Sequence, residues 1–176
     1  MACIITETVW GYVGISATRF GVARVILPAS SKEHVESLMN GAPHDDSDEA
    51  KMLAEQSAQA LRNYFNGLYD ERLRWLPVDL QCVSGEHRKA LLKVREVPVG
   101  ETITYGRLAL LIGLRNGARA VGQAMARNPV PIFIPCHRVI RADGGIGGFS
   151  FGVEMKLKLL MHERHMTLRD MALNCE

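Results

Sequence analysis

Short apolar runs broken by polar residues fill the first thirty positions of the chain. The runs CIITETVWGYVGI and FGVARVIL are rich in β-branched and aromatic side chains, and a polar break around Thr18 and Arg19 separates them. β-Branched side chains pack well on a pleated surface, so this pattern is typical of strands joined by turns. We therefore predict a β-rich start, in a hairpin or a small sheet.

Helical spacing replaces this alternation after residue 30. SKEHVESLM is a short amphipathic segment, and a longer helix is predicted over 49–66, where Asn66 and Gly67 end it. Ser47 or Asp48 is placed to cap this helix, and the acids just before it suit its N-terminal dipole. RLRWLPVDL then resembles a last short strand. The apolar residues at roughly helical spacing are Met52, Leu53, Ala60, Leu61, Tyr64 and Phe65.

From residue 84 onward the pattern indicates helices. SGEHRKALLKVREV opens with a candidate cap, Ser84, and PVG ends it. TYGRLALLIG and ARAVGQAMARN predict two short helices joined by the glycine-containing turn GLRNG, which is the outline of a helix-turn-helix. VEMKLKLLMHE predicts another helix, with Glu163 at its C-terminal end. The change of pattern predicts an α+β protein of two domains, over 1–82 and 83–176.

Composition limits the class of protein. Of the 176 residues 47% are hydrophobic and 23% charged, no apolar run is long enough to span a bilayer, and the N-terminus does not resemble a secretory leader. We expect a soluble, intracellular protein without a membrane partner. The four cysteines are widely scattered, which indicates separate thiols and no metal. A zinc site built from Cys3, Cys82 and a histidine such as His87 is the alternative.

The net charge of +2 conceals an asymmetry between the two halves. Residues 1–84 carry 7 basic and 11 acidic side chains, whereas residues 85–176 carry 14 and 8. From Thr102 to Ala142 there are six arginines and no acidic residue. Such a block sets up a positive potential that attracts phosphates. A solvated basic face with no polyanionic partner is the alternative.

Candidate chemistry is concentrated in the stretch NPVPIFIPCHRVI. A lone cysteine in an apolar run is most often inert packing, but Cys136 follows a rigid proline and precedes His137 and Arg138. Nearby positive charge lowers the pKa of a thiol, so this setting predicts a thiolate nucleophile. Neighbouring residues need not face each other, so His137 would act on the thiol through a water. Glu154 and Glu163 are the candidate carboxylates to orient it.

The segment GGIGGFSFG, over 144–152, has five glycines in nine residues. This is too many for a packed element and typical of a loop that opens its backbone amides to a ligand. It lacks the GK[ST] ending and the strand-to-helix context of nucleotide-phosphate loops, so we expect no nucleotide cofactor.

NPVPIFIPCHRVI resembles the signature of the O6-alkylguanine-DNA alkyltransferases, and TITYGRLA, GARAVGQAMARNP and the glycine loop followed by KLLMHE occur in that family's order. The resemblance is strong over about residues 85–165. It implies a ribonuclease-H-like α/β N-terminal domain and a mostly helical, winged-helix-like C-terminal domain with the helix-turn-helix. It also implies a monomeric DNA repair enzyme without cofactor. Such an enzyme transfers the alkyl group of O6-alkylguanine, and of O4-methylthymine, from double-stranded DNA to its own cysteine in a single turnover after base flipping.

The resemblance assigns roles to particular positions. Cys136 would accept the alkyl group, His137 would be the base acting through a water, Glu163 would orient His137, and Asn128 would brace the active-site turn. Arg119 matches the family's arginine finger, and DNA contacts are expected from its neighbours Arg115, Ala120 and Gln123. The substrate-binding residues implied are Tyr105, Val139, Phe149 and Ser150.

The chain departs from the family pattern in places. Phe149 stands where the family often has tyrosine, VSGEHRKALL replaces PFQxxVWxAL, and the zinc ligands of vertebrate members have no counterparts. Two other functions compete with the alkyltransferase reading. One is a lesion-binding or regulatory DNA-binding protein in which Cys136 has no chemical purpose. The other is a cysteine hydrolase or thiol peroxidase with multiple turnover on a small substrate.

Overall fold

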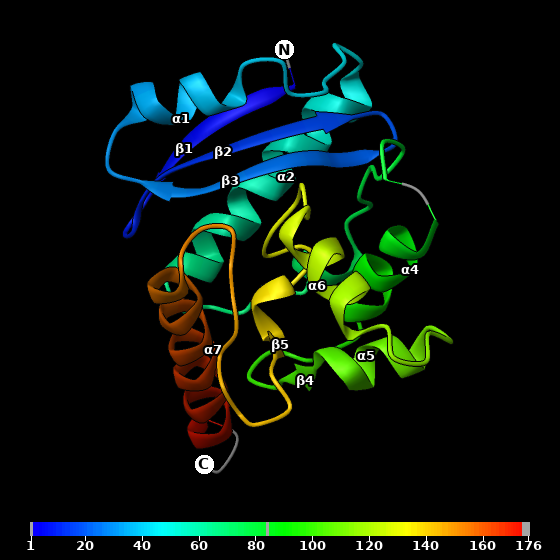
Figure 1. Ribbon diagram of the computed structural model, residues 1–176. Helices are drawn as coiled ribbons and strands as arrows, with labels where there is room; N and C mark the ends of the chain where they lie inside the picture. Colours follow the sequence, from blue (N-terminus) through cyan, green and yellow to red (C-terminus); the bar gives the residue numbers. More distant parts are fainter. Residues whose placement is uncertain (1, 84, 174–176) are drawn as a thin grey trace. The chain divides into compact units, whose positions relative to one another are not determined.

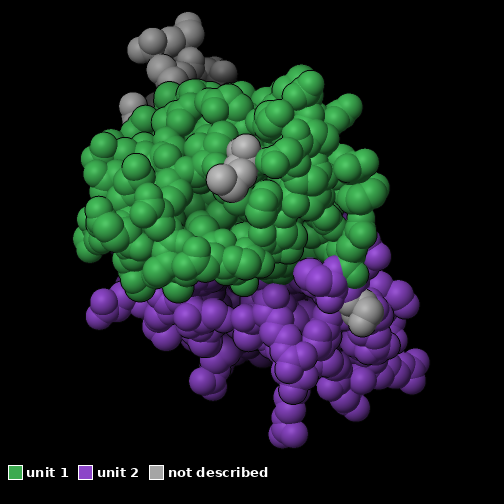
Figure 2. Space-filling view, turned by 90° about the horizontal axis from the view of Figure 1, so that it is seen from above, with its two compact units in different colours: residues 1–81, 129–133 green, residues 82–128, 134–176 purple. Residues whose placement is uncertain are grey.

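A computed structural model describes residues 2–83 and 85–173 (Figure 1). The chain forms two compact units, coloured separately in Figure 2: residues 1–81 with 129–133, and residues 82–128 with 134–176. The first unit therefore regains five residues from the middle of the second half, just before Cys136. No shift in composition marks that return. Each unit combines helices with a small sheet.

A three-stranded antiparallel sheet in the order β1-β2-β3 opens the first unit, with β1 at Cys3–Thr8, β2 at Gly11–Thr18 and β3 at Gly21–Ala29. The predicted β-rich start is confirmed, but the first apolar run holds two strands, because the chain turns at Val9 and Trp10. Gly11, which follows this turn, has φ 119°, and a Cβ there would lie 2.4 Å from the carbonyl oxygen of Ala29. Only glycine fits this close approach.

Helices α1 (Lys32–Met39) and α2 (Asp48–Phe65) cover opposite faces of this sheet (Figure 1). Alternate residues of a strand point to opposite faces, and β1 follows this rule. Cys3 and Ile5 pack against the cluster of Val35 and Met39 on α1, whereas Ala2 and Ile4 belong to the cluster of Ala50 and Ala54 on α2.

Helix α2 begins and ends close to the predicted residues. The side chain of Ser47 accepts a hydrogen bond from the backbone N–H of Ala50 at 3.2 Å, which identifies Ser47 as the cap. Met52 was expected on the apolar face but is 61% exposed. The buried face follows Ala50, Ala54 and Ala58 at a spacing of four residues, and Met52 lies half a turn away from it.

The prediction of a strand in RLRWLPVDL is wrong, because Arg72–Trp75 forms the short helix α3. The carboxylate of Asp70 accepts a hydrogen bond from the backbone N–H of Arg72 at 3.0 Å, which favours a helical turn over an extended chain. After Pro77 only Val78 pairs with the sheet, in an isolated parallel bridge to Val22.

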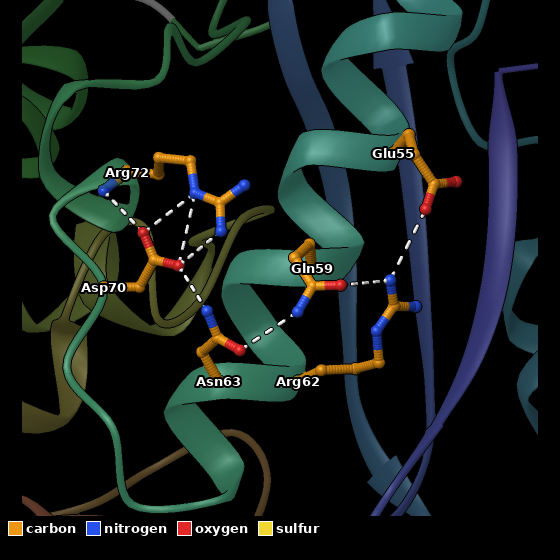
Figure 3. A network of polar contacts seen from close by, with 6 residues as sticks. All are labelled: Glu55, Gln59, Arg62, Asn63, Asp70 and Arg72. Carbon is orange, nitrogen blue, oxygen red and sulfur yellow. Dashed lines mark hydrogen bonds and ion pairs between the residues drawn. The ribbon is translucent and has the colours of Figure 1, made fainter.

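A polar network connects α2 to the start of α3 (Figure 3). Asp70 accepts three hydrogen bonds from the guanidinium of Arg72, two from Nε and one from Nη2, and one from Asn63. Asn63 in turn accepts from Gln59, and Gln59 accepts from Arg62 at 2.8 Å. The network therefore adds side-chain contacts to the backbone hydrogen bonds that fix the chain after α2.

In the second unit α4 (Gly85–Val94), α5 (Tyr105–Leu111) and α6 (Ala118–Ala126) pack together. The two predicted short helices are confirmed, and the turn between them contains Gly113 and Asn116 at positive φ. The predicted cap Ser84 lies outside the described residues. Strand β4 (Ile103–Thr104) pairs in parallel with β5 (Val139–Ile140), and the single turn η1 (Cys136–Arg138) directly precedes β5.

The last helix, α7, runs over Val153–Leu173 (Figure 1). Glu163 therefore lies in the middle of this helix. The prediction that placed it at the C-terminal end is wrong. Neither glycine nor proline follows Glu163 before the described chain ends, so nothing local stops the helix. Within residues 2–83 and 85–173, no helix has both the length and the apolar character needed to cross a membrane.

Candidate active site

The turn η1 holds Cys136 in a fixed position. The backbone N–H of Cys136 donates to the carbonyl of Ile134 at 2.8 Å, and that of Arg138 donates to the carbonyl of Pro135 at 2.9 Å. The buried amide of Asn128, just after α6, donates to the same Ile134 carbonyl at 2.8 Å and to the sulfur of Cys136 at 3.1 Å. The Asn128 side chain thus ties the end of α6 to the turn and to the thiol.

The ring of His137 is directed toward α7. Its Nε2 lies 2.7 Å from Oε1 of Glu163, and both side chains are fully buried. The other ring nitrogen, Nδ1, is buried and has no hydrogen-bond partner among the described residues. Because Nε2 contacts a carboxylate, Nε2 carries a hydrogen, and Nδ1 is the ring nitrogen that remains for a second partner. Glu154, the other candidate carboxylate, is exposed.

Arg138 binds the same carboxylate with two parallel hydrogen bonds. Its Nε donates to Oε2 of Glu163 and its Nη2 to Oε1, both at 2.9 Å, while Nη1 donates to the carbonyl of Val97 at 2.6 Å. Burial alone would raise the pKa of Glu163, but the charges and hydrogen bonds of His137 and Arg138 lower it well below its usual range. Glu163 is therefore ionised.

The expected thiolate is not the resting form of Cys136. Cys136 is 3% exposed, and burial raises the pKa of its thiol to about 11, against the opposing effects of the Asn128 hydrogen bond and the Lys156 charge. The sequence prediction relied on the charge of Arg138, but that guanidinium binds Glu163. The thiol is therefore protonated at neutral pH, and a base is needed to activate it.

Lys156, on α7, is fully buried beside the thiol. Its ammonium donates to the carbonyl of Val139 at 2.6 Å and lies 3.4 Å from the hydroxyl of Tyr105 and from the carbonyl of Gly148. Burial lowers the pKa of Lys156, and the negative charge of an ionised Cys136 would oppose that effect. Burial also raises the pKa of Tyr105. Lys156 thus joins β5, the glycine loop and Tyr105.

A cavity of about 540 Å³ opens onto Cys136. Tyr105 and the glycine loop form part of its wall, and two small residues of α6, Ala118 and Gly122, contribute another part. Val139, expected at the substrate, is fully buried and is not among the lining residues, although its carbonyl accepts from Lys156. The other lining residues are Met125, Ala126, Arg141, Gly147, Gly148, Phe149 and Ser150.

The glycine loop adopts neither helix nor strand, as predicted. Gly147 has φ 75°, and a Cβ there would lie 3.2 Å from the Tyr105 ring, so a side chain would push the loop off the tyrosine. The hydroxyl of Ser150 donates to the carbonyl of Ala126 at 2.7 Å, which fixes the loop to the end of α6. The ring of Phe149 packs against that of Phe151 with centroids 5.5 Å apart.

The predicted DNA-contacting residues lie on or just before α6. Arg119 and Gln123 are exposed on α6, Arg115 is exposed in the preceding turn, and Ala120 is half-buried. None of these four lines the cavity. The two arginines therefore give α6 and the preceding turn an exposed basic surface. Ala118 and Gly122 of the same helix line the cavity.

Sequence reasoning missed Lys156 and the partner of Arg138. A signal for Lys156 existed, because it lies seven residues before Glu163, and these two polar residues share one helical face with the buried Leu159 and Met166. Two charged residues on the buried face of a helix indicate a paired or functional site. No comparable signal identifies Glu163 as the partner of Arg138.

The described residues offer no evident metal site. Within 2–83 and 85–173, no three side chains of His, Cys, Asp or Glu gather closely enough to hold a metal ion, and this includes Cys3, Cys82 and His87. Cys3 is half-buried and Cys82 is exposed, and Cys175 lies outside the described residues.

Comparison with known proteins gives this site a family. The family model described as the DNA binding domain of 6-O-methylguanine DNA methyltransferase matches residues 86–165. A solved structure of Mycobacterium tuberculosis OGT in complex with DNA aligns over 92% of both chains, with a TM-score of 0.71 and 26% identity. Fold and site together therefore place the chain among proteins that share this DNA binding domain, with a buried cysteine at a cavity.

The sequence relatives are more specific. A methylated-DNA–protein-cysteine methyltransferase of Mycobacterium leprae is 47% identical over 118 residues, which cover 67% of this chain and 70% of that protein. The human protein of the same name is 55% identical over 75 residues, which span 43% of this chain but only 35% of the human protein. The chain belongs to the methylated-DNA–protein-cysteine methyltransferase family.

Proposed function

We propose that this protein repairs DNA by transferring the alkyl group of O6-alkylguanine, and of O4-methylthymine, to Cys136 in a single turnover. The observation that carries the proposal is the buried thiol at the cavity, next in sequence to a histidine whose Nε2 is held by a carboxylate and whose Nδ1 is buried without a hydrogen-bond partner among the described residues. A protonated thiol and a neutral base are the two parts that this reaction needs before substrate arrives.

The proposed reaction begins with activation of the thiol. Nδ1 of His137 takes the thiol proton through a bridging water, and the sulfur attacks the alkyl carbon. An S–C bond forms, the C–O6 bond breaks, and the electron pair leaves with guanine, which is protonated to the normal base. The product is a thioether, which has no good leaving group. Each molecule therefore acts once.

The substrate base must leave the duplex to react. Cys136 is 3% exposed, so its sulfur cannot reach an O6 atom that stays stacked between base pairs. The small residues Ala118 and Gly122 on α6 would let this helix approach the narrow minor groove, and Arg119 would fill the space left by the flipped nucleotide. Tyr105, the Val139 carbonyl, Phe149 and Ser150 would then contact the base and its alkyl group.

The proposal extends to the organisation of the chain. Residues 1–82 would be a ribonuclease-H-like domain of structural role, which is supported by an antiparallel sheet with a helix on each face. Residues 83–176 would be a winged-helix-like domain that carries the DNA contacts and the thiol, which is supported by α5, α6 and the adjoining β4-β5 pair. The protein would act as a monomer on double-stranded DNA.

The decisive test is the intact mass of the protein after incubation with a duplex that contains one O6-methylguanine. We expect a gain of one methyl group, mapped to Cys136, that stops at one equivalent. The variant Cys136→Ala should keep the lesion-containing duplex bound and gain no mass. An unchanged mass of the wild-type protein on bound duplex would support the lesion-binding alternative, and repeated turnover of a small substrate would support the hydrolase alternative.

Base flipping has a separate test in Arg119→Ala. We expect slow repair of the duplex but a normal rate with free O6-benzylguanine, because the free base needs no extrusion from a stack. Arg164→Ala, which removes an exposed arginine of α7, is the control. Equal duplex repair rates for Arg119→Ala and the control would remove the role of Arg119.

A further inference from the structure

The carboxylate of Glu163 is shared by two neighbouring residues of η1. It contacts Nε2 of His137 at 2.7 Å and accepts two hydrogen bonds from the guanidinium of Arg138, and the backbone N–H of Gly100 lies 3.4 Å from Oε2. Arg138 is 6% exposed, whereas His137 and Glu163 are fully buried. The three side chains form a charge cluster closed off from solvent.

Protonation of this cluster is governed by its net charge. With Arg138 positive and Glu163 negative, the cluster is neutral only if His137 is neutral. A buried cluster with a net charge is costly, because the charge has lost its hydration. Without the guanidinium, Glu163 and a neutral His137 would carry one negative charge, and uptake of one proton would restore neutrality.

Nδ1 of His137 loses its lone pair whether the additional proton binds to the ring or to Glu163. If the proton sits on the ring, both nitrogens of His137 are donors and Nδ1 has no lone pair. If it sits on Glu163, the carboxyl group donates to Nε2, and the hydrogen of the neutral ring moves to Nδ1. In both cases Nδ1 can no longer accept the thiol proton.

We propose that Arg138 is a positioning residue that keeps Nδ1 of His137 unprotonated at neutral pH by neutralising Glu163, and so preserves the base that activates Cys136. The inference deepens the proposed function and rests on it. It also gives a reason for the order of Cys136, His137 and Arg138 in one turn: the thiol, its base and the charge that keeps the base neutral lie in consecutive residues.

Other charged groups near η1 act on different atoms. Lys156, from α7, acts on the Cys136 thiol and donates to Val139, and Tyr105 lies beside Lys156. Helix α4 also packs against η1. Glu86, Arg88 and Lys89 are exposed, Lys93 pairs with Glu96, and the half-buried Arg95 follows the helix.

The test compares rates of reaction with free O6-benzylguanine from mildly acidic to mildly alkaline pH, because this substrate needs no DNA contacts. In Arg138→Met we expect the midpoint of the pH profile to rise by about one to three pH units, the effect of removing a close opposite charge from the carboxylate. Once the midpoint lies above neutral pH, each further pH unit of rise should lower the rate at neutral pH about tenfold, and the rate should recover at alkaline pH. Arg138→Lys keeps the charge and should keep the wild-type midpoint, and Arg164→Met controls for loss of a surface arginine.

The variant Glu163→Gln should shift the midpoint of the pH profile in the opposite direction. This variant leaves the positive charge of Arg138 next to the ring, so protonation of His137 becomes harder and the midpoint should move to lower pH, although the rate is lower at every pH. The double variant Arg138→Met with Glu163→Gln is neutral again, so its midpoint should return toward that of the wild type. If the Arg138→Met protein does not fold, the sign of the Glu163→Gln shift still decides.

A second readout does not depend on alkyl transfer. Nitrogen NMR of the His137 ring in the free protein should show a neutral ring with hydrogen on Nε2 in the wild type, and a proton on Nδ1 in Arg138→Met at neutral pH. If the wild type does not react with O6-benzylguanine but the ring behaves as stated, the proposed function fails, and what stands is that Arg138 controls the protonation of the His137 ring. A uniform loss of rate at all pH values in Arg138→Met, with an unchanged ring, would overturn the inference.

Discussion

The two units contain the same ion pair in different surroundings. Arg72 binds Asp70 in the first unit and Arg138 binds Glu163 in the second, each through hydrogen bonds from both Nε and Nη2. The side chains of the first pair are 29% and 10% exposed, and those of the second 7% and 0%. Bidentate geometry alone therefore does not distinguish a structural contact from a functional one.

The carboxylates of Asp70 and Glu163 differ in the further side chain that each one binds. Asp70 also accepts from Asn63, an amide that does not titrate (Figure 3). Glu163 also contacts His137, an imidazole whose two ring nitrogens can each carry a proton. A carboxylate shared between arginine and an amide fixes the chain, whereas a buried carboxylate shared between arginine and histidine controls a proton. Substitutions in the two networks should therefore differ in both size and kind of effect.

The largest effect is expected for Glu163→Gln. Removing one partner leaves the buried guanidinium of Arg138 uncompensated, which costs about 3 to 5 kcal/mol of unfolding free energy. The rate with O6-benzylguanine should also fall at least about a hundredfold, because His137 loses the group that orients it. Urea denaturation and single-turnover kinetics measure both. A loss below about 1 kcal/mol would mean that the buried pair resembles an exposed one.

A related prediction concerns acid stability. The pKa of Glu163 in the folded protein lies below its ordinary value of 4.5, so the unfolded chain binds more protons as the pH falls. The stabilisation from Glu163 is present above about pH 4.5 and is lost as the pH falls below it. Urea midpoints should therefore fall more steeply below that pH in the wild type than in Glu163→Gln. Parallel curves would contradict the assignment.

The next largest effect is expected on the rate at which the Cys136 thiol is alkylated, when the side-chain amide of Asn128 is removed. Asn128 donates to the Cys136 sulfur, and the thiol pKa is about 11. The rate of alkylation by iodoacetamide should rise about tenfold per pH unit from neutral pH until it levels off near that value. Asn128→Ala removes a hydrogen bond to the thiolate, so we expect a rate about tenfold lower at neutral pH. Asn63→Ala, in the first unit, is the matched control and should leave the rate unchanged.

The smallest effect is expected for Asp70→Asn. The pair that it breaks is partly exposed, so the cost should be about 1 kcal/mol or less. The rate with O6-benzylguanine and its pH profile should not change, because no titratable partner depends on Asp70. Urea denaturation and the same pH series used for Arg138→Met provide the measurement. A shifted pH profile would show that the two networks are not independent in function.

Local patterns predicted much of the fold. The cap at Ser47, the extent of α2, and the two short helices α5 and α6 depend on residues within a few positions of one another, and the structure has them where the sequence indicated. The predicted strand after α2 failed, because one hydrogen bond from the backbone to Asp70 favours a turn that β propensity does not register.

Long-range contacts decided the chemistry of the site. The sequence by itself determined that Cys136, His137 and Arg138 are adjacent and that a glycine loop and a helix with Lys156 and Glu163 follow. Only the tertiary structure decided that Arg138 binds Glu163, 25 residues away, and that burial keeps the thiol protonated. The physical reason is that charge acts through space and desolvation: periodicity fixes the face of a helix on which a residue lies, but not the group packed against it or its access to water.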